Sequence, residues 1–173
     1  PDASGTQVVM SLQRMHAVRA IDTANLTLTV EAGCVLQSVQ EAAREAGFLF
    51  PLSLAAEGSC TIGGNLGTNA GGTQVLRYGT MRELSLGLEV VTAAGEIWHG
   101  LGGVRKDNTG YDLRHLMIGS EGTLGIITEL TLRLFGIPEA SQTAMCSFNT
   151  IKEATQTVVM ALQCGLALNR IEL

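Results

Sequence analysis

Residues 58–72, GSCTIGGNLGTNAGG, contain six glycines and two asparagines in fifteen positions. A glycine inside an ordered element costs roughly 0.5–1 kcal/mol relative to alanine, so this segment favours an irregular backbone that something approaches closely. The paired glycines at 63–64 and 71–72 let successive N–H groups turn to one side, and such concave backbones bind anions. We expect the main-chain N–H groups near Gly63, Gly64 and Asn65 to converge on a phosphate. This hypothesis requires that those N–H groups are not already bonded to carbonyl oxygens of the chain.

The residues around this segment favour the same ligand. No aspartate or glutamate occurs between Glu57 and Glu83, whereas Arg77 and Arg82 lie inside that gap. Neither a G-x-x-x-x-G-K-[ST] motif nor a G-x-G-x-x-G motif opening a βαβ helix is present, which argues against P-loop and Rossmann sites. A purely structural loop is the open alternative. The short polar donors are Ser59, Thr61, Asn65, Thr68 and Asn69.

A second glycine cluster, GSEGTLGIIT, spans residues 119–128. Gly119, Gly122 and Gly125 are three residues apart and lead into an apolar strand, so a flat ring could lie against this backbone. The amides of Ile126 and Ile127 could bind an adenine edge, which needs only main-chain groups. A tight turn into a core strand is the alternative interpretation of the same residues.

Hydrophobic periodicity predicts an antiparallel sheet with flanking helices. Leu26, Leu28 and Val30 alternate with polar residues, which indicates one buried and one solvent-facing side. In the long strand expected over residues 122–135, the apolar–polar alternation shifts by one residue near Thr128, which predicts a bulge there. We expect strands over residues 6–12, 16–22 and 25–33, two strands within 86–100, and a long strand over 122–135.

Helical spacing predicts helices in three places. Leu36, Val39 and Ala43 recur at helical spacing before a glycine stop at Gly47, and a short helix is expected over residues 111–117. After residue 138 the pattern predicts strand, helix and strand, with Thr150 and Glu153 as a capping pair, T-x-x-E, and Gly165 ending the helix. We place a domain boundary near residues 136–139.

Composition limits the partners. The net charge of -5 argues against nucleic acid or an anionic membrane as partner. Charged residues make up only 16% of the chain, below the roughly 25% typical of soluble domains, so we expect part of the surface to be covered, for example in a homodimer. The four cysteines form no C-x-x-C pair, and no metal site is expected. The first residue, Pro1, and the ending NRIEL suggest a piece of a longer protein.

Five blocks, in order, resemble the FAD-linked 2-hydroxyacid dehydrogenases and oxidases. They are residues 58–72, RYG at 77–79, GLEVV at 87–91, RKDNTGYDL at 105–113 and GSEGTLGIIT at 119–128. This family of vanillyl-alcohol-oxidase-like flavoproteins includes D-2-hydroxyglutarate dehydrogenase, cytochrome-type D-lactate dehydrogenase and the glycolate oxidase flavin subunit. The resemblance covers about residues 1–136, and RKDNTGYDL is most similar to the D-2-hydroxyglutarate branch.

The resemblance implies an α+β fold: the second subdomain of a vanillyl-alcohol-oxidase-type FAD-binding domain, followed by the first β-α-β of a cap domain. Residues 1–136 would be the partial FAD-binding domain and residues 137–173 the start of the substrate domain. The family's earlier glycine-rich loop and most of its cap domain have no match here, so we expect no catalytic residue and no metal ligand in the chain. The implied FAD-binding residues are Pro51, Leu54, Gly58, Ser59, Cys60, Thr61, Gly63, Gly64, Asn65, Thr68, Asn69, Gly122, Gly125, Ile126 and Ile127.

The resemblance also implies a reaction and its partners. The enzyme would oxidise a D-2-hydroxy acid of the 2-hydroxyglutarate, lactate or glycolate type to the 2-oxo acid, with hydride passing to flavin N5. Electrons would go to a quinone, a cytochrome or a flavoprotein rather than to oxygen, in the cytoplasm or peripheral to the inner membrane. The chain alone is expected to be inactive and to bind FAD weakly. Two alternatives stay open: a non-catalytic accessory subunit, or another enzyme of the superfamily, such as an alcohol oxidase or an alkyl-dihydroxyacetone-phosphate synthase.

Overall fold

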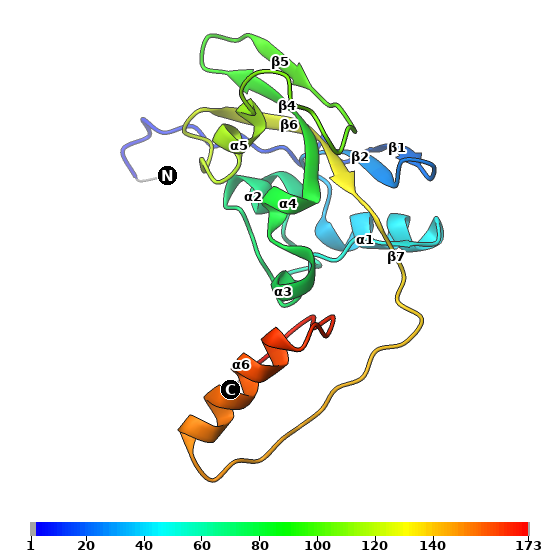
Figure 1. Cartoon of the computed structure of the whole chain (residues 1–173). Helices are drawn as coiled ribbons and strands as arrows, with labels where there is room; N and C mark the ends of the chain where they lie inside the picture. The colour runs from blue at the N-terminus through cyan, green and yellow to red at the C-terminus, as the bar shows by residue number, and fades with distance from the viewer. Residues whose placement is uncertain (1–2, 173) are drawn as a thin grey trace.

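The computed structural model describes residues 3–172 and centres on a five-stranded antiparallel sheet (Figure 1). The strand order is β1-β2-β6-β4-β5, so the long central strand β6 separates two hairpins that are distant from it in sequence. The strands are β1 (Val18–Asp22), β2 (Thr27–Glu31), β4 (Ser85–Thr92), β5 (Ile97–Gly100) and β6 (Gly125–Arg133). The predicted hairpins over residues 16–33 and 86–100 are confirmed.

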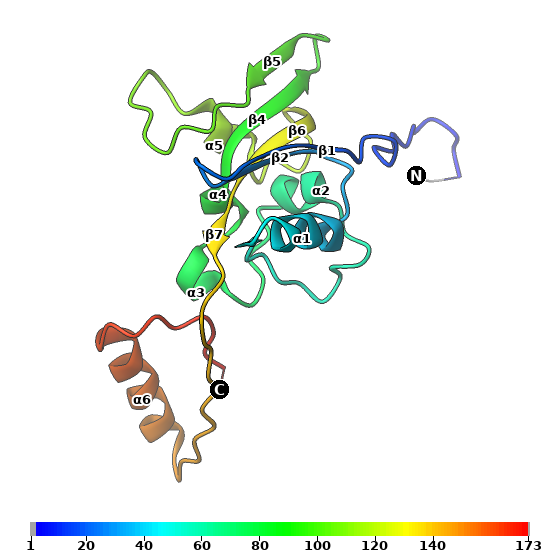
Figure 2. The same ribbon diagram turned by 90° about the vertical axis from the view of Figure 1, so that its right-hand side faces the viewer.

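Helices α1 (Leu36–Glu45) and α2 (Ile62–Gly67) lie on one face of this sheet (Figure 2). Leu28 and Val30 of β2 are fully buried and belong to the same core as Val39 of α1 and Leu66 of α2. The alternation in β2 therefore turns its apolar residues toward the helices, because successive strand residues point to opposite faces. Helix α1 ends before Gly47, whose φ of +83° is the left-handed conformation expected of a glycine stop.

Shorter elements surround the helical face. A two-stranded sheet pairs β3 (Phe48–Leu49) with β7 (Phe135–Gly136) and joins the end of α1 to the end of β6. Three helices of one turn each connect the remaining strands: α3 (Val75–Tyr78), α4 (Met81–Leu84) and α5 (Leu113–Met117). The helix expected over residues 111–117 is present as α5, where the Asp112 carboxylate accepts a hydrogen bond from the His115 N–H.

The predicted bulge at Thr128 is confirmed by the strand register. Glu89 of β4 lies opposite Glu129 of β6, whereas the next residue, Val90, lies opposite Ile127, so Thr128 is the extra residue. Its hydroxyl donates to the Glu89 carboxylate at 2.8 Å. The bulge leaves Glu89 and Glu129 directly opposite each other on the face of the sheet that α1 does not cover.

Three glutamates form a row across this second face. Glu31 lies opposite Glu129 in the register, and Glu129 lies opposite Glu89. A basic side chain stands at each end of the row: Arg19 bonds the Glu31 carboxylate, and His99 Nδ1 lies 2.7 Å from Glu89 Oε2. Burial raises the pKa of the Glu129 carboxyl, Arg19 opposes that effect, and the Glu89 and Glu31 carboxylates raise the pKa further.

Replacing Glu129 with glutamine is expected to stabilise the chain at pH 8. A raised folded-state pKa favours folding below the unfolded-state pKa, and this contribution is lost as pH rises through the folded-state value. Like charges directly opposite in a sheet are destabilising, so we expect a thermal midpoint higher by about 1–3 °C at pH 8 and a smaller difference at pH 4. Glu139→Gln, an exposed change of equal charge, is the control. A gain that does not depend on pH would contradict charge repulsion as its cause.

The prediction of strands is wrong in two regions of the described chain. Residues 6–12 form no strand in the described part of the chain, and Val8, Val9 and Met10 are largely exposed. After β7, helix α6 (Ile151–Gln163) is present, with the Glu153 N–H donating to Thr150 Oγ1 at 3.2 Å and Gly165 just past its end at a φ of +74°. The strands expected on either side of α6 are absent from the described part of the chain, and both views show this helix away from the sheet (Figures 1 and 2).

Candidate functional site

The glycine-rich segment is not the irregular cradle that its composition predicts. Residues 62–67 form helix α2, and two of the three expected anion-binding amides already have acceptors. The Gly63 N–H donates to the Ala32 carbonyl at 2.8 Å, and the Asn65 N–H donates to the Thr61 carbonyl at 2.9 Å. The expectation of converging free amides at Gly63–Asn65 is therefore wrong for Gly63 and Asn65. Any assignment of a cofactor must rest on other observations.

Two of the glycines in this segment serve packing. A Cβ on Gly63 would lie 2.6 Å from the Ala32 Cβ and 2.9 Å from the Ala32 carbonyl oxygen, so only glycine lets α2 approach the chain after β2. Gly72 has a φ of +73°, and a Cβ there would overlap the Ser53 carbonyl oxygen. That same oxygen accepts the Thr73 N–H at 3.0 Å, which fixes the end of the segment.

The expected cofactor residues divide by exposure. Asn65 is buried, and its side-chain amide donates to Cys60 Sγ at 3.5 Å, while Asn69 uses its side-chain oxygen to accept the Arg82 N–H at 3.0 Å. Thr68 donates to the Gly64 carbonyl at 3.1 Å. Buried are Pro51, Gly63, Asn65 and Ile127; half-buried are Leu54, Cys60, Thr61, Asn69, Gly125 and Ile126; exposed are Gly58, Ser59, Gly64, Thr68 and Gly122.

The fold brings the two glycine clusters together. The last carbonyls of α2 accept main-chain hydrogen bonds from the second cluster: Gly119 N–H to Leu66 O at 3.1 Å, and Glu121 N–H to Gly67 O at 2.9 Å. We call the exposed residues on either side of this junction, Gly64, Thr68, Glu121 and Gly122, the glycine surface. Sequence alone could not establish this contact, because the bonded residues lie more than fifty positions apart in the chain.

One edge of β6 is open beside this surface. β4 pairs with β6 along residues 125–132, but β2 pairs only with residues 129–133. The Ala32 N–H still reaches the Thr128 carbonyl at 2.9 Å, and beyond it no described residue outside β4 bonds the main chain of Gly125, Ile126 or Ile127. Neighbouring strand residues direct their main-chain groups to opposite edges, so only alternate residues of Gly125–Ile127 offer such groups here, and Ile127 is buried.

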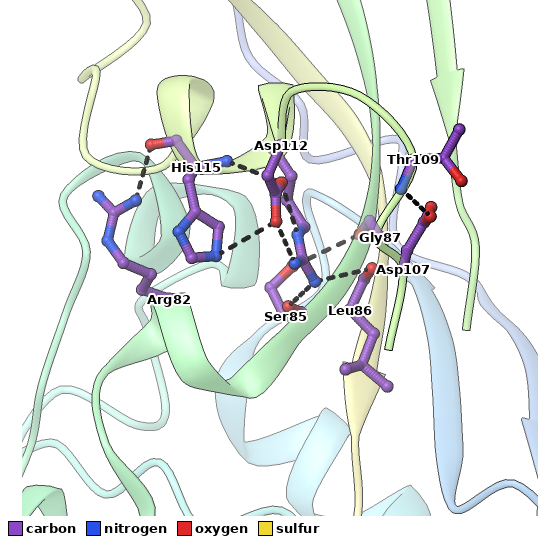
Figure 3. Close-up of polar contacts among 9 residues, drawn as sticks. Arg82, Ser85, Leu86, Gly87, Asp107, Thr109, Asp112 and His115 are labelled. Carbon is purple, nitrogen blue, oxygen red and sulfur yellow. Dashed lines mark hydrogen bonds and ion pairs between the residues drawn. The ribbon is translucent and has the colours of Figure 1, made fainter. Parts of the chain in front are cut away.

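A polar network that the motifs did not reveal holds α5 in place (Figure 3). The Arg114 side chain donates to the Asp112 carboxylate at 2.5 Å and to the Ser85 and Leu86 carbonyls at 2.8 and 3.0 Å. The Arg114 hydrogen bond is the main cause that lowers the pKa of Asp112. Arg82 donates to the His115 carbonyl at 2.6 Å from the other side. The network joins α4, α5 and the start of β4 next to the second glycine cluster.

The comparison with known families decides which cofactor this arrangement serves. Residues 2–100, more than half of the chain, match the family described as FAD binding domain. The chain belongs to the FAD binding domain family. The cofactor predicted from the sequence, FAD, is thereby confirmed, and the expected α+β fold with an antiparallel sheet is confirmed as well.

Curated relatives of this FAD binding domain are named as dehydrogenases. A D-2-hydroxyglutarate dehydrogenase of Xanthomonas citri pv. viticola is 45% identical over 98% of this chain and 36% of its own length. A mitochondrial D-2-hydroxyglutarate dehydrogenase of Danio rerio is 45% identical over 87% of this chain and 28% of its own length. A probable mitochondrial D-lactate dehydrogenase, also of Danio rerio, is 44% identical over 95% of this chain and 33% of its own length. The chain thus spans about a third of the length of these relatives.

A solved structure supports the vanillyl-alcohol-oxidase-type fold. An alkyldihydroxyacetonephosphate synthase superposes with a TM-score of 0.65 at 26% identity, covering 74% of this chain and 23% of that chain. Within residues 3–172 no helix is long and apolar enough to cross a membrane, and no group of three or more histidine, cysteine or acidic side chains is arranged to hold a metal ion.

The glycine surface offers room for a flat group, and the one charged side chain within it is the Glu121 carboxylate. Gly122 has a φ of +78°, and a Cβ there would meet only open space, so the chain leaves this end of the glycine surface uncovered. Thr92, directly opposite Gly125, has a buried hydroxyl with no hydrogen-bond partner among residues 3–172. A cavity of about 520 Å³ lies elsewhere, bordered by Val75, Val158 and Leu162. Which of the fifteen expected residues contact FAD stays a prediction.

Proposed function

We propose that this chain supplies part of the FAD site of an enzyme that oxidises a D-2-hydroxy acid to the 2-oxo acid. The observation that carries the proposal is the junction of two glycine clusters within an FAD binding domain, where Gly119 and Glu121 bond the end of α2. The names of the similar proteins, D-2-hydroxyglutarate and D-lactate dehydrogenases, support the substrate class. The 2-hydroxyglutarate, lactate and glycolate types are all within the proposal.

The proposed roles follow from exposure. Gly64 of α2 and Thr68, which follows the last residue of α2, would face the diphosphate, with the Thr68 hydroxyl able to donate to it in place of the Gly64 carbonyl. The open edge of β6 at Gly125–Ile127 would bind the adenine through main-chain groups. FAD, when bound, supplies the hydride-accepting chemistry. Residues Pro51, Gly63 and Asn65 would act from below the surface by fixing the backbone.

Substrate and electron partners belong to the same proposal. We assign no catalytic base and no substrate-binding charge to the 173 residues, and the chain alone is expected to be inactive. A quinone, a cytochrome or a flavoprotein would accept the electrons. We propose residues 1–136 as part of the FAD domain and residues 137–173 as the start of a substrate domain, with a cytoplasmic or membrane-peripheral location. Some of the similar proteins are named mitochondrial.

A second candidate reaction has specific support. The similar solved structure is an alkyldihydroxyacetonephosphate synthase, so the same scaffold could serve a different substrate. A substrate screen on the whole protein distinguishes the two candidates: reduction of bound flavin by a D-2-hydroxy acid supports the dehydrogenase, and its absence with every such acid supports the second candidate. A colourless whole protein would instead favour an accessory role.

Replacing Gly64 with leucine tests the cofactor surface directly. Gly64 is exposed on α2 and a Cβ there meets only the Thr61 hydroxyl at 3.1 Å, so the helix should accept the change. The larger side chain would cover the glycine surface, and we expect FAD affinity to fall at least about tenfold, because it blocks close approach to the backbone. The measurement is a titration of flavin fluorescence with the chain.

Ser38→Leu, at an exposed position of α1, is the matched control and should leave the FAD titration unchanged. Equal FAD affinity in Gly64→Leu and the unaltered chain would show that the diphosphate does not lie on α2. Stoichiometric retention of yellow colour after desalting would contradict the expectation that the 173 residues alone bind FAD weakly.

A further inference from the structure

Arg82 bonds the first glycine cluster and the residue directly before the second. Its main-chain N–H donates to the Asn69 side-chain oxygen at 3.0 Å, at the end of the first cluster. Its guanidinium donates to the Ile118 carbonyl at 2.8 Å, one residue before the second cluster begins, and to the His115 carbonyl at 2.6 Å. Figure 3 shows this side chain reaching the helix α5 that carries His115.

The rest of α4 fixes Arg82 relative to the first cluster. The Met81 N–H donates to the Ala70 carbonyl at 2.9 Å, so the start of α4 follows any movement of residues 69–70. Arg82 forms no ion pair with a carboxylate among residues 3–172, which leaves its guanidinium to the two carbonyls at the end of α5. Hydrogen bonds from a charged donor are shorter and stronger than neutral ones, and a cation is favourable at the C-terminal end of a helix.

We propose that Arg82 is a positioning residue that sets the separation of the two halves of the FAD surface. This inference rests on the proposal that FAD lies across the glycine surface. Arg82 holds α5 and residue 118 against the first cluster, so that Gly119 and Glu121 reach the α2 carbonyls. Its Nη2 lies 3.6 Å from the place that a Cβ on Gly119 would occupy, so it also borders the start of the second cluster.

The test compares Arg82→Ala with Arg77→Ala in the 173-residue chain. Arg77 is exposed on α3, inside the same acid-free stretch, and its side chain reaches only the Asn169 amide oxygen at 3.3 Å and the Tyr78 ring. Both variants remove one positive charge. We expect Arg82→Ala to speed hydrogen exchange at the Gly119 and Glu121 amides at least about tenfold and to weaken FAD binding by a similar factor, and Arg77→Ala to change neither.

The conservative variant Arg82→Lys keeps the charge but cannot donate to both carbonyls in the same fork geometry, so it should lie between wild type and Arg82→Ala in both measurements. If Arg82→Ala does not fold, Arg82→Lys decides, and wild-type exchange in it overturns the inference. Unchanged exchange in Arg82→Ala, or equal loss of FAD in Arg77→Ala, also overturns it. If the unaltered chain binds no FAD, the proposed cofactor surface fails, while the exchange rates still decide the role of Arg82.

Discussion

Replacing Gly63 with alanine is expected to destabilise the chain by about 3 kcal/mol or more. The added Cβ would meet the Ala32 Cβ at 2.6 Å and the Ala32 carbonyl oxygen at 2.9 Å, and backbone cannot rotate away as a side chain can. Moving α2 outward to relieve the contact would stretch the 2.8 Å hydrogen bond between the Gly63 N–H and Ala32 O. Urea unfolding followed by fluorescence of Trp98, the single tryptophan, which packs against the core, measures the effect.

The adjacent glycine supplies the matched control. Gly64→Ala adds the same methyl group to the same helix, but the methyl meets only the Thr61 hydroxyl at 3.1 Å, which can rotate. Because alanine is the better helix former by roughly 1 kcal/mol, this variant should be as stable as the wild type or slightly more so. Equal unfolding midpoints for the two variants would mean that α2 does not pack on Ala32 as described.

Replacing Gly72 with alanine is expected to lower the free energy of unfolding by about as much as Gly63→Ala, for two separate reasons. The φ of +73° is unfavourable for any residue with a Cβ by roughly 1–2 kcal/mol. The new methyl would also overlap the Ser53 carbonyl oxygen, and moving that oxygen would break its hydrogen bond from Thr73. We expect a combined loss of about 3 kcal/mol in the free energy of unfolding, measured by the same urea titration.

Gly71→Ala is the control for Gly72→Ala. Its φ is not positive, and its Cβ would approach only a side-chain atom, the Val75 Cγ2 of an exposed residue, at 2.8 Å, rather than backbone. A loss below about 1 kcal/mol is therefore expected. If Gly71→Ala proves the more harmful of the two, the turn at residues 71–73 differs from the one described.

The sheet could be predicted from the sequence because its signal is local. Alternation over Leu26–Val30 located the side of β2 that packs on the helices, but the expected solvent-facing side is wrong for Thr27 and Glu31, which are buried. The slip in period near Thr128 located a bulge that the register confirms. Residues 6–12 have the same β-rich composition but form no strand in the described part of the chain, since composition alone does not supply a neighbouring strand. Helix α2 was missed because three of its six residues are glycine, and packing on Ala32 overrides that low propensity.

The site was harder to predict than the fold, for a physical reason. A glycine needed for close packing and a glycine needed for ligand approach have the same sequence signature, and here Gly63 is of the first kind while Gly64 is exposed. Asn65 looked like a ligand donor but is buried against Cys60. Arg82 could be noticed as a charge, but its acceptors at His115 and Ile118 lie more than thirty residues away and depend on how α4 meets α5.

The open edge of β6 has a consequence for the chain without its cofactor. The main chain of Gly125–Ile127 presents hydrogen-bonding groups that β2 does not cover. An unpaired strand edge can accept an extended backbone, and Val8, Val9 and Met10 of another copy are largely exposed within a β-rich segment. If the adenine binds this edge as proposed, flavin loading and strand addition between copies would compete for the same peptide groups.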